Sequence, residues 1–99
     1  MQHKYFVIDL SYVRPLEVVD QYKDQHMSFL KEYYDKNIFI CSGPKSPRTG
    51  GIIFAKSFLL AELEQILNND PFKIEKIAEY KITEFSPAMF SEDFRSCIT

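Results

Sequence analysis

Hydrophobic and polar positions change from a strand pattern to a helix pattern along the first third of the chain. Residues 4–10 (KYFVIDL) are rich in aromatic and β-branched side chains, which favour strands. Phe6 and every second residue after it share one face, and apolar residues also occupy the other, so we expect both faces to be partly covered. From Leu16 to about Tyr34 apolar residues recur every three or four positions, which predicts a helix. Pro15 suits the start of this helix and Asn37 its end.

Two strands and the longest loop follow. Residues Ile38 to Ser42 and Gly51 to Lys56 are predicted strands, and the run GPKSPRTG between them is dense in turn formers. We expect a hairpin loop there; the alternative is a lid over a substrate. Glycines permit positive φ and close approach to a ligand, and this region contains Gly43, Gly50 and Gly51.

The last third predicts a helix, a short helical turn and a strand. Ser57 is a natural N-cap for a helix whose apolar stripe extends to Leu67, and the run NNDP then ends it. Residues 72–77 form one further helical turn, and residues 78–84 alternate as a half-buried strand. Phe85 interrupts this alternation, which suggests a bulge. No clear period is present in the tail that follows.

The order β-α-β-β-α-β is that of the ferredoxin-like plan, an α+β fold with an antiparallel sheet and helices on one face. The chain has 99 residues, which is the length of one domain; we place its core at 3–86 and a C-terminal tail at 87–99. The other face of the sheet needs cover, and a homodimer that packs sheet against sheet supplies it. Tyr5 and Phe39 are our candidates to face the partner.

Composition excludes several classes of protein. The net charge is −2, from 12 basic and 14 acidic residues, and this balance lacks the positive field that nucleic-acid binding needs. No apolar run approaches the ~20 residues that span a bilayer, so we expect no membrane segment. Cys41 and Cys97 form no C-x-x-C pair and are expected to be free thiols. These features favour a cytoplasmic protein.

His26 stands where packing alone would place an apolar residue. It occupies the apolar stripe of the first helix, so its side chain should point toward the sheet. An imidazole titrates near neutral pH and suits a general base or acid. The alternative interpretation is a structural histidine whose hydrogen bonds are satisfied in the core.

Asp70 is the second candidate. It precedes Pro71, and the commonest use of such an aspartate is to cap the turn that begins there. In a ferredoxin-like fold both helices lie on one face of the sheet, so the carboxylate could instead accept the N–H of His26 and fix its tautomer. Both interpretations remain open at the level of sequence.

Four further residues are candidates for substrate binding. Ser42 and Gly43 begin the long loop, and Phe72 lies beside Asp70. Arg14 could bind a carboxylate; the alternative interpretation is that Arg14 is a solvated surface residue. The loop lacks P-loop spacing, and with only two histidines in the chain we predict neither a metal nor any other cofactor.

Four segments together resemble the YCII-related (YciI-like) family. That family shows a histidine followed by an aromatic-Leu pair, a strand that ends in Gly-Pro, a Gly before an apolar strand, and Asp-Pro-Phe or Asp-Pro-Tyr. The matching segments here are QHMSFL (25–30), FICSGP (39–44), GGIIF (50–54) and NDPF (69–72). The resemblance extends over roughly residues 3–86. The chain departs from the family at Lys23, where members often carry Arg, whose planar guanidinium Lys lacks.

The resemblance implies a dimeric α/β barrel with a His–Asp dyad, which falls on His26 and Asp70. It suggests a lyase- or isomerase-type enzyme that uses general acid/base chemistry, by proton transfer or elimination, on a small organic substrate, cyclic ones included. We expect the pocket between helices and sheet, lined by some of Phe6, Ile8, Phe54 and Tyr80. The alternative is a non-catalytic module that binds a small ligand or a protein and contains a structural histidine.

Overall fold

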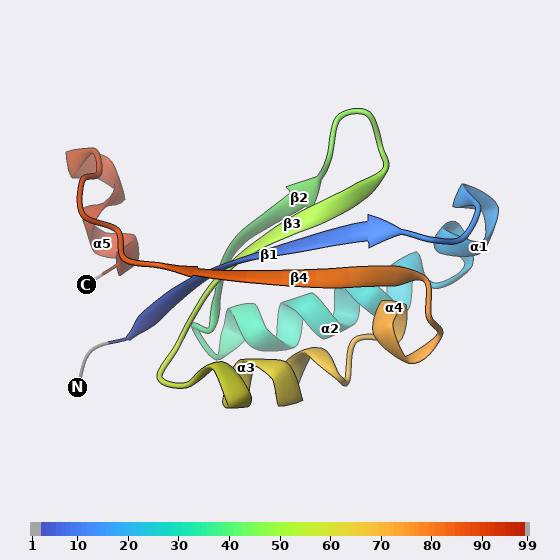
Figure 1. The fold of residues 1–99 in the computed structure, drawn as a ribbon, viewed down its shortest axis with the longest axis horizontal. Coiled ribbons are helices and arrows are strands. Elements are labelled where there is room, and N and C mark those ends of the chain that lie inside the picture. Colours follow the sequence, from blue (N-terminus) through green and yellow to red (C-terminus); the bar gives the residue numbers. More distant parts are fainter. Residues whose placement is uncertain (1–2, 99) are drawn as a thin grey trace.

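The fold is a four-stranded antiparallel sheet with helices α2, α3 and α4 on one face (Figure 1). The computed structural model describes residues 3–98. The sheet order is β2-β3-β1-β4, so β1 is an inner strand bonded to both β3 and β4. This order confirms the predicted ferredoxin-like plan. The strands are β1 (Lys4–Tyr12), β2 (Phe39–Pro44), β3 (Gly50–Ser57) and β4 (Ala78–Phe85). The helices are α1 (Leu16–Gln21), α2 (Lys23–Asp35), α3 (Leu60–Leu67), α4 (Pro71–Ile74), η1 (Glu92–Phe94) and α5 (Arg95–Ile98).

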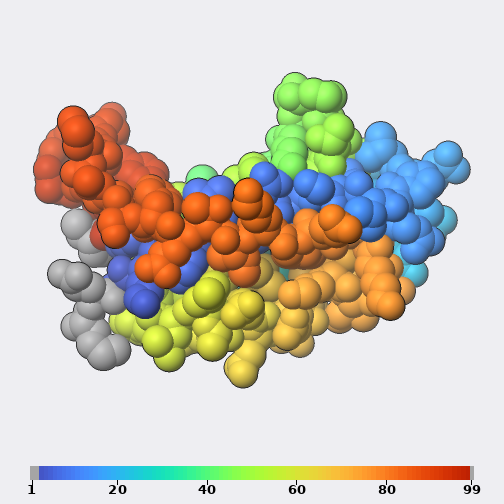
Figure 2. Space-filling view, viewed as in Figure 1, coloured from blue at the N-terminus to red at the C-terminus, as the bar shows by residue number. Residues whose placement is uncertain are grey.

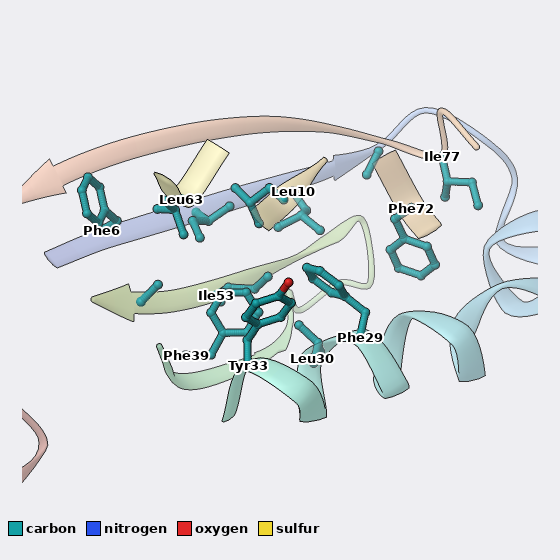
Figure 3. Packing of buried hydrophobic residues seen from close by; sticks show 14 of the residues in the cluster. Phe6, Leu10, Phe29, Leu30, Tyr33, Phe39, Ile53, Leu63, Phe72 and Ile77 are labelled. Atoms are coloured by element: carbon teal, nitrogen blue, oxygen red, sulfur yellow. The ribbon is translucent and has the colours of Figure 1, made fainter. Parts of the chain in front are cut away.

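The main core lies between the sheet and the helices (Figure 3). Phe6, Ile8 and Leu10 of β1 are buried on this side, while the alternate residues of the strand are half-buried on the other side. Both faces of β1 are therefore covered in part, as its doubly apolar pattern predicted. The core side chains contributed by helices include Phe29, Leu30, Tyr33, Leu63, Leu67 and Phe72.

The first predicted helix is two helices in the structure. Tyr22 separates α1 from α2, with φ −110° and ψ 4°, outside the helical region. The apolar period continues across this break, so the pattern alone did not reveal it. Asn37 ends the second helix with φ 59°, as expected for a residue that tolerates the left-handed conformation.

Two local predictions at the second helix and the last strand were wrong. Ser57 does not cap α3: it is the buried last residue of β3, paired with Lys4, and Leu59 takes the N-cap position without a side-chain hydrogen bond. Pairing with β1 keeps the chain extended through Ser57. Phe85 forms no bulge either, because it pairs with Tyr5 in unbroken register. The only shift in register among the described strands lies in β2, between Phe39 and Cys41.

Phe39 was also predicted to face a partner subunit, and the structure corrects this. Its side chain is 3 % exposed, and its ring lies 5.9 Å from that of Phe29 and 5.5 Å from that of Tyr33, between centroids. Phe39 therefore faces α2, in the core (Figure 3). Phe39 pairs with Ala55 of β3, which is fully buried, and this pairing places both side chains on the helix side of the sheet.

The long loop is shorter than predicted, since β2 ends at Pro44 and β3 begins at Gly50. Glycine permits a positive φ, but none of the three glycines here adopts one. Gly50 serves close packing instead: a β-carbon at this residue would lie 1.8 Å from the carbonyl oxygen of Leu10. A side chain at this position would collide with the backbone of β1.

The C-terminal segment crosses to the sheet face that the helices leave open (Figure 1). The ring of Phe94 stacks on that of Phe54, with centroids 5.9 Å apart, and the Tyr5 hydroxyl donates to the carbonyl of Ile98. The space-filling view is hollowed between this segment and the β2–β3 loop (Figure 2). The C-terminal segment of the same chain thus covers one end of the open face of the sheet.

Candidate functional site

His26 lies on the side of α2 that faces the core, one turn before the buried residues Phe29 and Leu30. Its side chain is 12 % exposed. The imidazole stacks on the ring of Phe72 from α4, with centroids 4.0 Å apart and planes 6° apart. This contact holds the histidine ring in one plane between two helices.

Asp70 is fully buried and accepts hydrogen bonds on both of its carboxylate oxygens. Its Oδ1 lies 2.8 Å from Nδ1 of His26 and 3.0 Å from the backbone nitrogen of Phe72, which donates to it. Its Oδ2 accepts from the hydroxyl of Tyr80. The bond from Phe72 makes Asp70 the N-cap of α4, with Pro71 in the first turn. One carboxylate therefore caps a helix and also contacts the histidine.

The contact with Asp70 favours one tautomer of the neutral His26 ring. An ionised carboxylate only accepts hydrogen bonds, so Nδ1 of His26 is the nitrogen that carries the proton. In the neutral ring Nε2 then has a free lone pair. Burial raises the pKa of Tyr80 well above its ordinary value, and the negative charge of Asp70 raises it further. The Tyr80 hydroxyl accordingly remains protonated and donates.

A cavity of about 350 Å³ opens beside His26. It is within the size range of pockets that bind small molecules. Three of the four predicted substrate-binding residues line it, namely Ser42, Gly43 and Phe72, whereas Arg14 is exposed and is not part of the lining. The remaining lining residues are Leu10, Tyr12, Lys23, Met27, Leu30, Pro44, Arg48, Gly51, Ile52 and Ile53.

The predicted lining of the pocket was wrong in detail. Phe6 and Ile8 are fully buried between sheet and helices and are not part of the cavity lining. Phe54 stacks with Phe94 of the C-terminal segment on the open face of the sheet. Tyr80 bonds to Asp70 and is not part of the cavity lining. The cavity instead uses the ends of β1, β2 and β3.

Both charged side chains in the cavity lining, apart from the titratable His26, are cationic: Lys23 and Arg48. Arg48 comes from the β2–β3 loop, and its guanidinium pairs with Asp20 of α1 at 2.5 Å. The hydrogen bond from Arg48 lowers the pKa of Asp20. Only the fold shows that Arg48 bridges to α1 beside the cavity.

The bond between Tyr80 and Asp70 was missed at the level of sequence, although part of the signal was present. Tyr80 alternates with Ile82 along β4, and Tyr80 pairs with Leu10, a core residue of β1. This register places Tyr80 on the helix side of the sheet, where Asp70 is. Alternation along β4 thus predicts which face of the sheet Tyr80 lies on, but not that its hydrogen-bond partner is Asp70.

Residues 3–98 contain neither a cluster of metal ligands nor a membrane-spanning helix. No group of three or more His, Cys, Asp or Glu side chains in this range could hold a metal ion. None of the helices described is both long and apolar enough to cross a membrane. Cys41 is exposed, Cys97 is partly buried, and both are free thiols.

Fold and site together define a ferredoxin-like α+β subunit with a buried carboxylate–histidine pair beside an apolar cavity. The chain belongs to the YCII-related domain family, whose model matches residues 5–86. This match confirms the resemblance found in the four sequence segments. A search of curated proteins finds no match.

A solved structure shares this fold. It is the 5-chloro-2-hydroxyhydroquinone dehydrochlorinase of Burkholderia phenoliruptrix AC1100, in complex with 2,5-dihydroxybenzoquinone. The TM-score is 0.72 at 19 % sequence identity, over 83 % of this chain and 93 % of that one. At this identity the likeness shows the fold alone.

Proposed function

We propose that this chain is a small enzyme in which His26 acts as a general base on a small organic substrate, cyclic ones included. The observation that carries the proposal is a cavity-lining histidine whose Nδ1 is bonded, at 2.8 Å, to the fully buried carboxylate of Asp70. A bonded Nδ1 leaves Nε2 to accept a proton, and the carboxylate stabilises the imidazolium that forms. Catalytic sites commonly use this arrangement of base and orienting group.

The proposed reaction is a proton transfer or an elimination. Nε2 of His26 takes a proton from a carbon of the substrate, and the electron pair of the broken C–H bond forms a double bond. In an elimination, the leaving group on the neighbouring carbon departs with its bonding electrons. In an isomerisation, an existing π bond at the neighbouring carbon shifts to the next atom, and the imidazolium returns the proton to that atom. Asp70 remains ionised throughout and orients the ring.

The lining of the cavity supports a substrate that combines an apolar ring with an acidic group. The walls are mainly apolar, and the cationic groups of Lys23 and Arg48 lie among them. Arg48 is shared with Asp20, which neutralises part of its charge. A carboxylate or an ionised phenol on the substrate would be attracted to the positive charges of Lys23 and Arg48 in the lining.

The alternative is a non-catalytic module that binds a small ligand or a protein. The observation that favours it is the stacking of His26 on Phe72 at 4.0 Å, together with the capping role of Asp70. Both contacts serve the packing of α2 against α4 without any reaction. In this case a ligand would bind and be released unchanged.

An exchange assay separates the two functions. Small cyclic carbonyl acids are screened in D₂O for protein-dependent replacement of their acidic C–H hydrogens, followed by ¹H NMR. If His26 is the base, His26→Gln lowers the exchange rate by about 100-fold or more, the usual contribution of a general base. His3→Gln is the matched control, because His3 is exposed and stacks on Phe58. Full exchange in a folded His26→Gln variant would remove His26 from the mechanism.

A binding measurement tests the substrate class. The probe is 2,5-dihydroxybenzoquinone, the molecule bound in the solved dehydrochlorinase structure. We expect wild-type protein to bind this acidic ring, and Arg48→Gln to weaken binding about tenfold, as for loss of one charge-assisted hydrogen bond. Lys31→Gln is the control, since Lys31 is exposed on α2 and lies outside the cavity lining. Equal affinities of the two variants would argue against recognition of an acid by Arg48.

We also propose a cytoplasmic homodimer, formed by the open faces of two sheets. Val7 and Ile52 lie on the sheet face opposite the helices and are half-buried, and the C-terminal segment covers only one end of this face (Figure 2). Sedimentation at micromolar concentration should give twice the 11.7 kDa mass of one chain, and Val7→Arg should halve it. Lys81→Arg on β4 is the control. A wild-type monomer would overturn the proposal.

A further inference from the structure

Tyr80 contributes the third hydrogen bond to Asp70, from a different element of the fold. The residue lies in β4, opposite Leu10 of β1, and its hydroxyl donates to Oδ2 of Asp70. The other oxygen, Oδ1, receives His26 and the backbone nitrogen of Phe72. The carboxylate is thus fixed at both oxygens by donors from α2, α4 and β4.

We propose that Tyr80 is a positioning residue that holds the carboxylate plane of Asp70, and through it the tautomer of His26. This inference rests on the proposed function, and adds to it a residue that lies outside the cavity lining. Without a donor at Oδ2, the carboxylate is held only at Oδ1, so rotation about its Cβ–Cγ bond is less restrained. Oδ1 would then accept less well from Nδ1 of His26, whose distance is 2.8 Å here.

The environment of Tyr80 suits a permanent donor. Burial and the charge of Asp70 both raise the pKa of Tyr80 above its ordinary value, which favours the protonated hydroxyl that donates to Oδ2. The ammonium of Lys73 lies 5.5 Å from the centroid of the Tyr80 ring and covers it from outside. Tyr80 therefore acts by orientation and not by transfer of its own proton.

The test is ¹⁵N NMR of histidine-labelled full-length protein at about pH 9, above the range in which imidazoles titrate. The ¹⁵N shifts give the ratio of Nδ1–H to Nε2–H tautomers at His26. In Tyr80→Phe this ratio should fall about fivefold, the change that a loss of about 1 kcal/mol produces. Tyr33→Phe is the matched control, because it removes a hydroxyl from another buried tyrosine, and should leave the ratio unchanged.

An unchanged ratio in folded Tyr80→Phe would overturn the proposal. A second measurement needs no variant: in wild-type protein the hydrogen-bonded hydroxyl proton of Tyr80 should give a downfield resonance, and its absence from native protein would also overturn the proposal. Neither experiment uses a substrate. The exchange assay on His26→Gln can therefore fail while the tautomer result stands, and the reverse, so the two proposals are tested separately.

Discussion

Substitution of Asp70 by alanine should lower the free energy of unfolding by about 3 kcal/mol. Asp70 is fully buried, and three donors converge on it: Nδ1 of His26, the backbone nitrogen of Phe72 and the hydroxyl of Tyr80. Alanine removes every acceptor and leaves these donors without their partner. The backbone nitrogen of Phe72 and the hydroxyl of Tyr80 cannot easily turn to solvent, so the loss of stability is expected to be large.

The magnitude follows from the individual contacts. Loss of an N-cap side chain costs about 1 kcal/mol. Each buried donor left unsatisfied costs about 1–3 kcal/mol, and Tyr80 is the clearest instance. His26 is 12 % exposed and can reach water, so its contribution is smaller. Removal of a buried carboxylate also relieves its desolvation, which offsets part of the total.

Urea denaturation measures this loss directly. With a slope of about 1–3 kcal/mol per molar urea, the midpoint should fall by about 1–3 M, and thermal melting should fall by roughly 12–24 °C. Asp70→Asn retains an acceptor for the cap and should be intermediate. Asp35→Ala, which removes an exposed carboxylate at the end of α2, should change little. A loss under about 1 kcal/mol in Asp70→Ala would refute this account of the junction.

Three other outcomes follow from packing and titration. Gly50→Ala should destabilise the protein strongly, because the new β-carbon lies 1.8 Å from the carbonyl oxygen of Leu10, whereas Gly43→Ala meets nothing within 4 Å; equal urea midpoints would contradict this. Leu67→Ala, at a fully buried position, should cost about 2–5 kcal/mol in the same assay. The raised pKa of Tyr80 means that unfolded chains lose its proton above about pH 10 while folded ones keep it, so stability falls as pH rises through that range. Tyr80→Phe should flatten this alkaline dependence of the melting temperature.

The order of elements was predictable from the sequence because each main strand and helix buries one face. Alternation in β1 and β4, and the three- and four-residue steps of α2 and α3, are consequences of that burial. The residues at which elements begin and end are not determined by this periodicity. Tyr22 leaves the helical region although the apolar period continues, and Ser57 stays in the strand because Lys4 pairs with it.

The site was predictable only in its parts. His26 was conspicuous because an imidazole occupied an apolar stripe, and Asp70 because it preceded Pro71. Their contact joins residues 44 positions apart and depends on how α2 packs against α4. No local pattern encodes that packing. The same holds for Arg48, whose pairing with Asp20 of α1 joins residues 28 positions apart.

The double use of Asp70 explains why its two interpretations need not compete. Capping of α4 places Oδ1 at 3.0 Å from the backbone nitrogen of Phe72, which fixes the carboxylate relative to a rigid turn. The ring of Phe72, carried on the same turn, stacks on His26 and sets the plane in which Nδ1 approaches that oxygen. A local helix-start signal thus supplies both the acceptor and the support for the histidine. The position of α4 therefore helps to determine whether His26 presents a free Nε2, and changes that shift α4 should disturb the site before they disturb the sheet.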